Sequence, residues 1–249
     1  GDLSAVVTGC ILALNLPVTL PPYIALIGAV AAIVVVKQLF GGLGQNFVNP
    51  AAAARVILLV SFPAQMSRWV EPFYYRTVSL GDAVTTATPL VTGDTEYLRL
   101  FLGVHGGCIG ETCALALLLG GGYLMLRRVI SPVIPLCFLG TLAGLTWLLG
   151  GDGLAAVLSG GALLGAFFMA TDYVTSPVTF GGKFVFGIGC GLITVLIRRF
   201  GALSEGVSYA IVLMNILTPH IERLTMPRAF GAPRKSLRRS KKSKEGAAK

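Results

Sequence analysis

The sequence predicts an all-α, polytopic integral membrane protein with about eight transmembrane or half-membrane helices and an inverted-topology repeat. Of its 249 residues, 54% are hydrophobic and only 12% are charged, and the mean hydropathy is +0.78. A soluble domain has about a quarter of its residues charged. Apolar blocks close to the ~20 residues that cross a bilayer recur along the chain. We expect these blocks to be helices, because lipid offers no partners to open backbone groups.

The predicted helices follow one another from the first residues to the start of a polar tail. They cover residues 4–20, 22–40, 50–70, 108–126, 132–149, 154–170, 183–200 and 206–224. The first block is cut short by Pro17, Pro21 and Pro22, because proline interrupts a helix. The third begins at Asn49 and Pro50, a pair typical of a helix N-terminus.

Two parts of the chain resemble each other. Residues 3–9 match residues 154–160 at an offset of 151, and each copy follows an aspartate. At an offset of 160, Gln45 corresponds to Glu205 and Arg55 to Asn215, so polar residues recur inside apolar blocks. Shared membrane composition is the alternative explanation for these matches.

If the matches reflect a repeat, a three-element unit occurs at about residues 3–70 and again at 154–224. Five elements separate the two starts, an odd number, so the copies would be inverted. Inverted repeats are typical of transporters, with sites near the membrane midplane at short or broken helices. Both first elements fit this description, since the second copy ends at Thr171 and Asp172.

Charge is concentrated at the C-terminus. Residues 1–222 hold ten basic and ten acidic residues, whereas residues 223–249 hold ten basic residues and one acid, which accounts for the net charge of +9. A basic run of this kind suits anionic lipid or nucleic acid. No aromatic residue lies among these basic ones, so nucleic acid has no further support. We therefore expect a membrane domain over residues 1–226 and a disordered cytoplasmic tail over 227–249.

Counting elements back from a cytoplasmic tail gives the topology. The polar loop at about residues 71–99 falls on the outer face, and Arg127 and Arg128 fall inside, as the positive-inside bias prefers. Arg198 and Arg199 would fall outside, against that bias, unless they are buried at a helix end.

Cysteine and histidine usage gives no sign of a metal centre. The five cysteines are scattered and form no CxxC pair, so we expect them to be reduced, buried, small apolar residues. His105 and His220 lie far apart and are expected to be structural. The chain begins at Gly1 directly before a membrane segment, so we expect it to be the later part of a longer protein.

The outer loop carries the sharpest motif, residues 82–90, Asp-Ala-Val-Thr-Thr-Ala-Thr-Pro-Leu. Thr88 ends a Thr85-Thr86-Ala87-Thr88 tetrad, and Asp82 lies six positions before it. This pattern resembles an acceptor for a flavin joined through its phosphate. The aspartate can help to bind the metal that accompanies phosphate transfer, and small neighbours leave room for a bulky ring. A threonine-rich outer loop with a helix cap is the alternative.

Longer stretches resemble a known family. They are residues 41–55, 61–66 with Trp69, 82–90, 106–112, 127–130 and 171–177. Together they resemble the D subunit of the Rnf ion-translocating ferredoxin:NAD⁺ oxidoreductase, also known as an electron transport complex. That family is homologous to the B subunit of the sodium-pumping NADH:quinone reductase. The resemblance covers nearly all of residues 1–226, although the family has further N-terminal spans that are absent here.

The resemblance implies a flavin-carrying electron transport subunit of the cell membrane. It implies FMN linked covalently to Thr88 on the outer face, attached by a flavin transferase. It also implies a complex of six subunits that passes electrons between ferredoxin and NAD⁺ while Na⁺ or H⁺ crosses the membrane. A second, non-covalent flavin such as riboflavin is expected at the interface between the repeat units.

Several polar residues inside apolar blocks are further candidates, since ionisable groups in a membrane are usually functional. Arg55 could bind a flavin phosphate or pair with an acid. Glu111 could contact a cofactor or simply favour a helix N-terminus. Asn49, like Asn46, could contact a cofactor or cap the helix. Asp152 and Asp172 are expected to be loop or cap residues, with an ion path as the alternative.

Two other classes of function remain open at this stage. One is a cofactor-free transporter or channel with the same inverted repeat. The other is a scaffold subunit, for which Thr88→Val would leave electron transfer unchanged.

Overall fold

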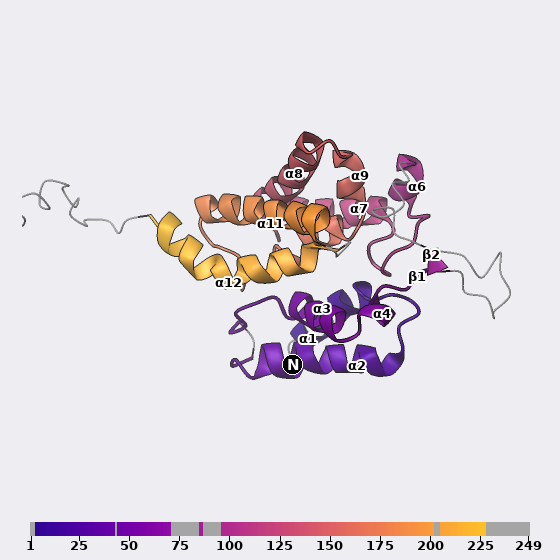
Figure 1. Cartoon of the computed structure of the whole chain (residues 1–249). Helices are drawn as coiled ribbons and strands as arrows, with labels where there is room; N and C mark the ends of the chain where they lie inside the picture. Colours follow the sequence, from indigo (N-terminus) through magenta and orange to yellow (C-terminus); the bar gives the residue numbers. More distant parts are fainter. Residues whose placement is uncertain (1–2, 43, 71–84, 87–95, 202–204, 228–249) are drawn as a thin grey trace, which may run out of the picture.

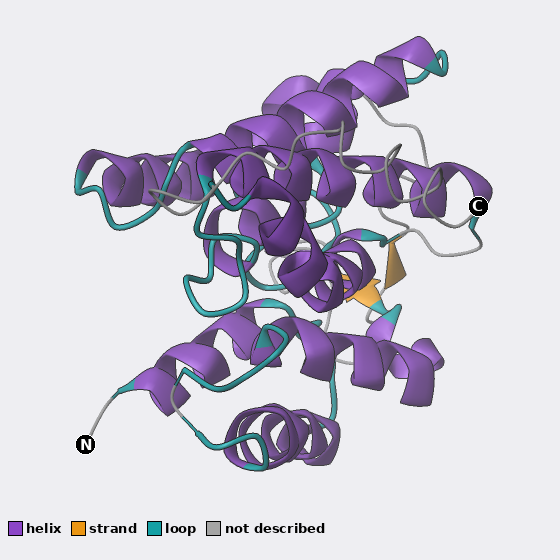
Figure 2. Ribbon diagram, turned by 90° about the vertical axis from the view of Figure 1, so that its left-hand side faces the viewer, coloured by secondary structure: helices purple, strands orange, loops and turns teal. Residues whose placement is uncertain are grey.

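The computed structural model describes residues 3–42, 44–70, 85–86, 96–201 and 205–227. In this part of the chain helices dominate, and the strands are limited to one short pair (Figure 2). The prediction of a mostly helical chain is confirmed.

The first half of the described chain begins with short apolar helices. Its elements are α1 (Ser4–Leu14), α2 (Pro22–Val30), the π-helix η1 (Ala31–Gln38), α3 (Pro50–Ser61), α4 (Pro63–Met66), β1 (Trp69–Val70) and β2 (Thr85–Thr86). The helix α3 ends before Pro63 because a residue that precedes proline disfavours the helical conformation, which divides the predicted block 50–70.

The second half contains longer helices. Its elements are α6 (Tyr97–Leu102), α7 (Ala114–Leu126), α8 (Val133–Leu148), α9 (Gly153–Leu158), α10 (Ala162–Leu164), the π-helix η3 (Gly165–Met169), α11 (Phe180–Phe200) and α12 (Val207–Thr225). A described helix therefore overlaps each of the eight predicted apolar blocks, and α6 lies outside them.

The block at 154–170 is interrupted. The helix α9 ends at Ser159, and Gly160 and Gly161 follow with φ angles of 64° and 67°. Such left-handed angles suit glycine, and they turn the chain before α10 and η3 begin. The helix α1 likewise ends at Asn15, ahead of the predicted prolines. Both predicted first elements are thus short or broken helices.

The helices form two groups that meet at α3 and α12 (Figure 1). Leu12, Ile24 and Leu58 belong to a core formed by α1, α2 and α3. Phe138, Phe186 and Met214 belong to a second core, which Ala52 of α3 joins. The two groups are therefore packed together as well as linked by the chain.

Close packing of α8 and α11 depends on glycine. A Cβ atom at Gly187 would lie 2.9 Å from the backbone oxygen of Ile134, and one at Gly191 would lie 2.8 Å from that of Phe138. Only glycine allows the two backbones to approach so closely, as small residues do between membrane helices.

Among the described helices, α11 alone is long and apolar enough to cross a membrane by itself. Five others are apolar but shorter, with 10–17 residues. The count of eight membrane-crossing or half-crossing helices and the inverted repeat stay predictions.

One prediction about the cysteines is wrong. All five are free, as expected, but Cys10 is exposed and Cys113 and Cys137 are only half-buried. The physical reason at Cys10 is that α1 buries a single face, around Thr8 and Leu12, and Cys10 lies on another.

Candidate functional site

A buried arginine occupies the junction of the two helix groups. Arg55 is only 2% exposed and lies in α3. The start of α3 is fixed by Asn49, whose side-chain oxygen accepts hydrogen bonds from the N–H groups of Ala51 and Ala52. The Asn49 amide also donates to the backbone oxygen of Met169 at 3.0 Å. The capping role predicted for Asn49 is confirmed, and the same side chain joins α3 to η3.

The Arg55 guanidinium contacts four side chains from three other parts of the chain. Its Nη1 donates to Oδ1 of Asn15 at 2.6 Å, and its Nη2 donates to Sγ of Cys108 at 3.3 Å. Nη2 also forms a close ion pair with Glu205 and lies 3.6 Å from Oε2 of Glu111. We call these five residues, Asn15, Arg55, Cys108, Glu111 and Glu205, the Arg55 cluster.

The two acids of the cluster are buried as deeply as the arginine. Glu111 is 3% exposed and Glu205 is 7% exposed. Oε1 of Glu111 accepts a hydrogen bond of 2.9 Å from the N–H of Cys108, and the Cys108 thiol donates to the backbone oxygen of Asn15 at 3.1 Å. Buried charges persist where they are paired and hydrogen-bonded, and the cluster meets part of that requirement.

The Arg55 guanidinium is paired with acids, which is one of the two roles predicted for it. Glu111 was a candidate in its own right and proves to be one of these acids. Glu205 was not singled out as a site residue. Its only sequence signal was its match to Gln45 within the repeat, which marked it as a polar residue in an apolar block.

A metal site is not the best description of this cluster. The ligand atoms of Cys108, Glu111 and Glu205 lie within 4.8 Å of one another, which would suit a cation. The Arg55 guanidinium already contacts all three side chains, so the positive charge among them is supplied by the protein.

Arg198 binds backbone carbonyl groups at the end of α9, next to the Arg55 cluster. Its Nη1 donates to the backbone oxygen of Ala156 at 2.7 Å, and its Nη2 to those of Ser159 and Gly160 at 3.2 and 2.9 Å. These bonds satisfy carbonyl groups that the end of α9 leaves open. Arg198 is thus half-buried at a helix end, whereas its neighbour Arg199 is exposed. The exception that the topology prediction allowed for this pair therefore holds in part, and only for Arg198.

The break after α9 lies against the Arg55 cluster at Gly161. A Cβ atom there would lie 2.8 Å from Oε2 of Glu111 and 3.5 Å from Nη1 of Arg55. Asn15, at the end of α1, contacts the same guanidinium. The cluster therefore lies where the ends of two short or broken helices meet, the arrangement in which membrane transporters place their sites.

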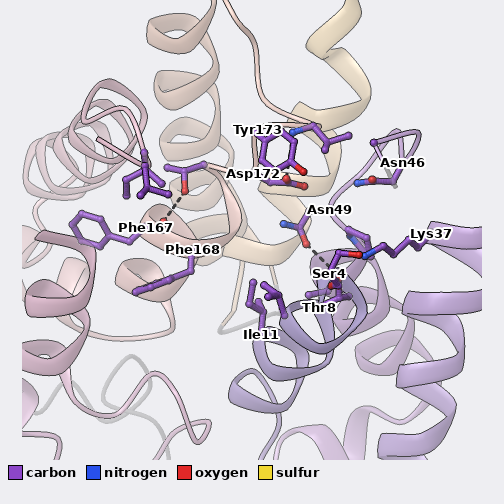
Figure 3. A pocket seen from close by; sticks show the side chains of 18 of the residues that line it. Ser4, Thr8, Ile11, Lys37, Asn46, Asn49, Phe167, Phe168, Asp172 and Tyr173 are labelled. Atoms are coloured by element: carbon purple, nitrogen blue, oxygen red, sulfur yellow. Dashed lines mark hydrogen bonds between the residues drawn. The ribbon is translucent and has the colours of Figure 1, made fainter. Parts of the chain in front are cut away.

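A cavity of about 430 Å³ is lined by residues of α1, η1 and η3, among others (Figure 3). Its wall includes the aromatic rings of Phe167, Phe168 and Tyr173. The polar side chains around it include those of Ser4, Thr8, Lys37, Asn46, Asn49, Thr171 and Asp172. Neither Arg55 nor Glu111 is part of this wall, so the structure does not bring these two predicted candidates to the cavity.

Two charged residues mark one end of the cavity. Lys37 is buried in η1, and Asp172 lies in the segment between η3 and α11. Burial raises the pKa of Asp172, an effect opposed by hydrogen bonds from the N–H of Val174 and the hydroxyl of Thr175 and by the charge of Lys37. Asp172 therefore borders the cavity and also organises its own turn.

The predicted flavin acceptor lies largely beyond the part that the structure describes. Asp82, Ala87 and Thr88 are outside the described residues. Thr85 and Thr86 form β2, which pairs antiparallel with β1, so that Trp69 faces Thr86 and Val70 faces Thr85.

Asp152 has the capping role that the sequence predicted. Its Oδ1 accepts hydrogen bonds from the N–H groups of Leu154 and Ala155 at 2.9 and 3.1 Å. The hydroxyl of Tyr97 donates to its other oxygen at 2.5 Å, which joins α6 to the N-terminus of α9.

Comparison with known proteins gives a consistent result. The protein-family model described as NQR2, RnfD, RnfE family matches residues 1–231. The chain is 52% identical over 239 residues to the D subunit of the Na⁺-translocating ferredoxin:NAD⁺ oxidoreductase complex of Acetobacterium woodii, covering 92% of this chain and 73% of the relative.

Two further relatives carry related names. The D subunit of the proton-translocating ferredoxin:NAD⁺ oxidoreductase complex of Clostridium ljungdahlii is 42% identical over 255 residues, with 94% of this chain and 76% of the relative covered. The D subunit of the ion-translocating oxidoreductase complex of Stutzerimonas stutzeri is 40% identical over 269 residues, with 92% and 76% covered.

Proposed function

The chain belongs to the NQR2, RnfD, RnfE family, and we propose that it is the flavin-carrying subunit of its complex, with FMN esterified through its phosphate to Thr88. As a member of this family it is a membrane subunit of an ion-translocating electron transport complex, an oxidoreductase and translocase of several subunits. The proposal adds how this subunit takes part, by carrying electrons on a bound flavin.

The observation that carries the proposal is the Thr85-Thr86-Ala87-Thr88 tetrad with Asp82 six positions before Thr88. Phosphate transfer to a hydroxyl needs an accessible acceptor and a metal held near the phosphate. A threonine flanked by small residues supplies the first, and Asp82 helps with the second. The ester would form as the Thr88 oxygen attacks the FMN phosphorus of FAD and AMP leaves.

The cavity between η1 and η3 suits the second, non-covalent flavin. Its volume of about 430 Å³ is within the ~300–1,000 Å³ usual for small-molecule sites. Phe167, Phe168 and Tyr173 offer aromatic surface to a planar ring. Lys37 and Asn46 offer polar groups to the carbonyl and imide edge that a flavin presents. When bound, such a flavin supplies one-electron oxidation and reduction.

The neighbouring asparagines have different parts in this cavity. Both polar atoms of the Asn49 side chain are already used, by the cap of α3 and by the Met169 carbonyl, so Asn49 shapes the wall. Asn46 donates to the backbone oxygen of Val48 at 3.1 Å, which leaves its carbonyl oxygen to accept from a ligand.

The same proposal includes the orientation of the subunit in the membrane and its partner proteins. We place the loop that bears Thr88 on the outer face and the basic tail in the cytoplasm, as the positive-inside bias favours. The complex would have six subunits, and other subunits would hold the ferredoxin and NAD⁺ sites. A flavin transferase would load this chain, which would then take electrons from a neighbouring cofactor and pass them on.

The test is the flavin fluorescence of the denatured chain on a gel, after co-expression with a flavin transferase. Fluorescence in the wild type that disappears in Thr88→Val and persists in Thr92→Val, a threonine outside the 82–90 motif, supports the proposal. A dark wild-type band, with the transferase active on another target, contradicts it and favours a cofactor-free transporter.

A further inference from the structure

The Arg55 cluster contains two acids in direct contact with one base. Arg55 contacts Glu205 and lies 3.6 Å from Glu111, and all three side chains are buried. If both acids are ionised, this contact group carries one uncompensated negative charge. An uncompensated buried charge is strongly unfavourable, so the group needs either a bound proton or a second positive charge close by.

The hydrogen bonds of the two carboxylates show which of their oxygen atoms lack a partner. Oε1 of Glu111 accepts from Cys108, and Oε2 of Glu205 is paired with Arg55. Among the described residues, Oε2 of Glu111 and Oε1 of Glu205 are buried and have no hydrogen-bond partner. A carboxylate oxygen without a donor is uncommon in a protein interior and calls for an explanation.

The other titratable groups around the pair do not supply the donor. Arg198 is a second positive charge that attracts both acids, but it forms no hydrogen bond with either of them among the described residues. Its two Nη atoms donate to the backbone carbonyls at the end of α9, and its buried Nε has no hydrogen-bond partner in the described part of the chain. The Cys108 thiol donates to Asn15 and is therefore protonated and neutral. His105, beside Glu111, is buried in its loop, and burial lowers its pKa. Tyr209 of α12 is a neutral neighbour of Glu205.

We propose that Glu111 and Glu205 bind one exchangeable proton between them. Two carboxylates that share a buried site rarely ionise together, and one proton held by the pair removes the excess charge. It also turns one unpartnered oxygen into a hydrogen-bond donor. Glu111 lies against Gly161 at the break after α9, and the Arg55 that pairs with both acids contacts Asn15 at the end of α1. A small shift of either helix end would therefore change the surroundings of the pair.

The charge of the Glu111–Glu205 pair can change inside the membrane, because the pair can bind or release a proton. In an ion-translocating complex, such a group can release or take up its proton when the charge of a nearby cofactor changes. This last step rests on the proposed function, whereas the presence of the proton does not.

Infrared spectroscopy of the purified complex at neutral pH tests the proposal, because a protonated carboxylic acid and a carboxylate absorb at different frequencies. We expect the wild type to show the carbonyl stretch of one buried carboxylic acid per chain from this pair, shifted after exchange into D₂O. Glu111→Gln and Glu205→Gln are each expected to remove it.

Two control variants separate this signal from those of other acids. Glu96→Gln removes an exposed carboxyl group, and Asp172→Asn removes the acid beside the cavity; each should leave the band in place. A wild type without the band, or a band that survives in both cluster variants, would overturn the proposal. Arg198 would then be the source of the balancing charge. Because no flavin is needed for the band, this result is independent of flavin attachment.

Discussion

At the scale of single residues, Arg55 connects parts of the chain that lie far apart in sequence. It contacts Asn15 before it, and Cys108, Glu111 and Glu205 after it. Each contact is buried, so each group depends on Arg55 for compensation that water cannot supply. Arg55 is therefore a structural centre of the membrane domain.

Arg55→Met is expected to destabilise the protein by about 3–5 kcal/mol, because it leaves buried acids without their base. The free energy of unfolding in detergent is the measurement. Combining Arg55→Met with Glu205→Gln should recover part of the loss, since one of the orphaned charges is removed. Arg68→Met changes an exposed arginine and should stay within about 0.5 kcal/mol of the wild type. Equal losses in both arginine variants would contradict this role.

At the scale of elements, the ends and breaks of the helices supply contacts to the Arg55 cluster. The end of α1 presents Asn15 to Arg55, and the break after α9 presents Gly161 to Glu111. Arg198 and Asp152 complete the two ends of α9 with hydrogen bonds. Interrupted helices in a membrane need such partners, because open backbone groups have no water to bind.

Gly161→Ala is expected to destabilise the protein by about 1–3 kcal/mol, because its φ of 67° is strained for alanine and the added Cβ would meet Glu111. Gly122 in α7 is the matched control, since a Cβ there meets no atom within 4 Å. Gly122→Ala should be neutral or stabilising by up to about 1 kcal/mol. Thermal unfolding of the two variants checks the contrast, and a tolerated Gly161→Ala would refute it.

The contact between α6 and α9 is expected to weaken in acid. The hydrogen bond from Tyr97 lowers the pKa of Asp152 in the folded protein. Its contribution to stability is therefore present above the unfolded pKa of about 3.9 and is lost as pH falls through the lower folded value. Tyr97→Phe should destabilise the protein at pH 7, and the difference from wild type should shrink as the pH falls toward about 3. A difference that is independent of pH would contradict this account.

At the scale of the whole molecule, two helix groups enclose a polar cluster at the C-terminal end of α1 and an aromatic cavity along the same helix. Met169 contacts both Asn15 and Asn49, so the wall of the cavity and the Arg55 cluster share a support. A flavin in the cavity and a proton at the cluster would thus lie in one connected structure, as coupling between electron and ion movement requires.

Lys37→Met is expected to reduce the non-covalent flavin that acid extraction releases from the purified complex, because a buried cation beside the cavity is lost. Flavin attached covalently to the chain should not change. Arg68→Met, which removes a positive charge outside this wall, should retain both flavins. Unchanged extractable flavin in Lys37→Met would remove Lys37 from the proposed site.

The sequence predicts the positions of the helices better than it predicts the contacts between them. Each predicted apolar block overlaps a described helix, whereas α6 lies outside all of them. Local chemistry identified the caps at Asn49 and Asp152, because these depend on neighbouring residues. The pairing of Arg55 with Glu205 joins residues 150 positions apart, and no local pattern specifies such a contact. The break at Gly160 and Gly161 was equally hidden, since glycine is common in this chain and only the fold gives these two their left-handed angles.

The central claim is that Thr88 carries FMN, and the most direct measurement is the intact mass of the chain purified after co-expression with a flavin transferase. We predict that the wild type and Thr92→Val gain the mass of one FMN less one water, and that fragmentation places the gain on Thr88. Thr88→Val should keep the unmodified mass. An unmodified wild-type chain, or a flavin on another residue, would contradict the account.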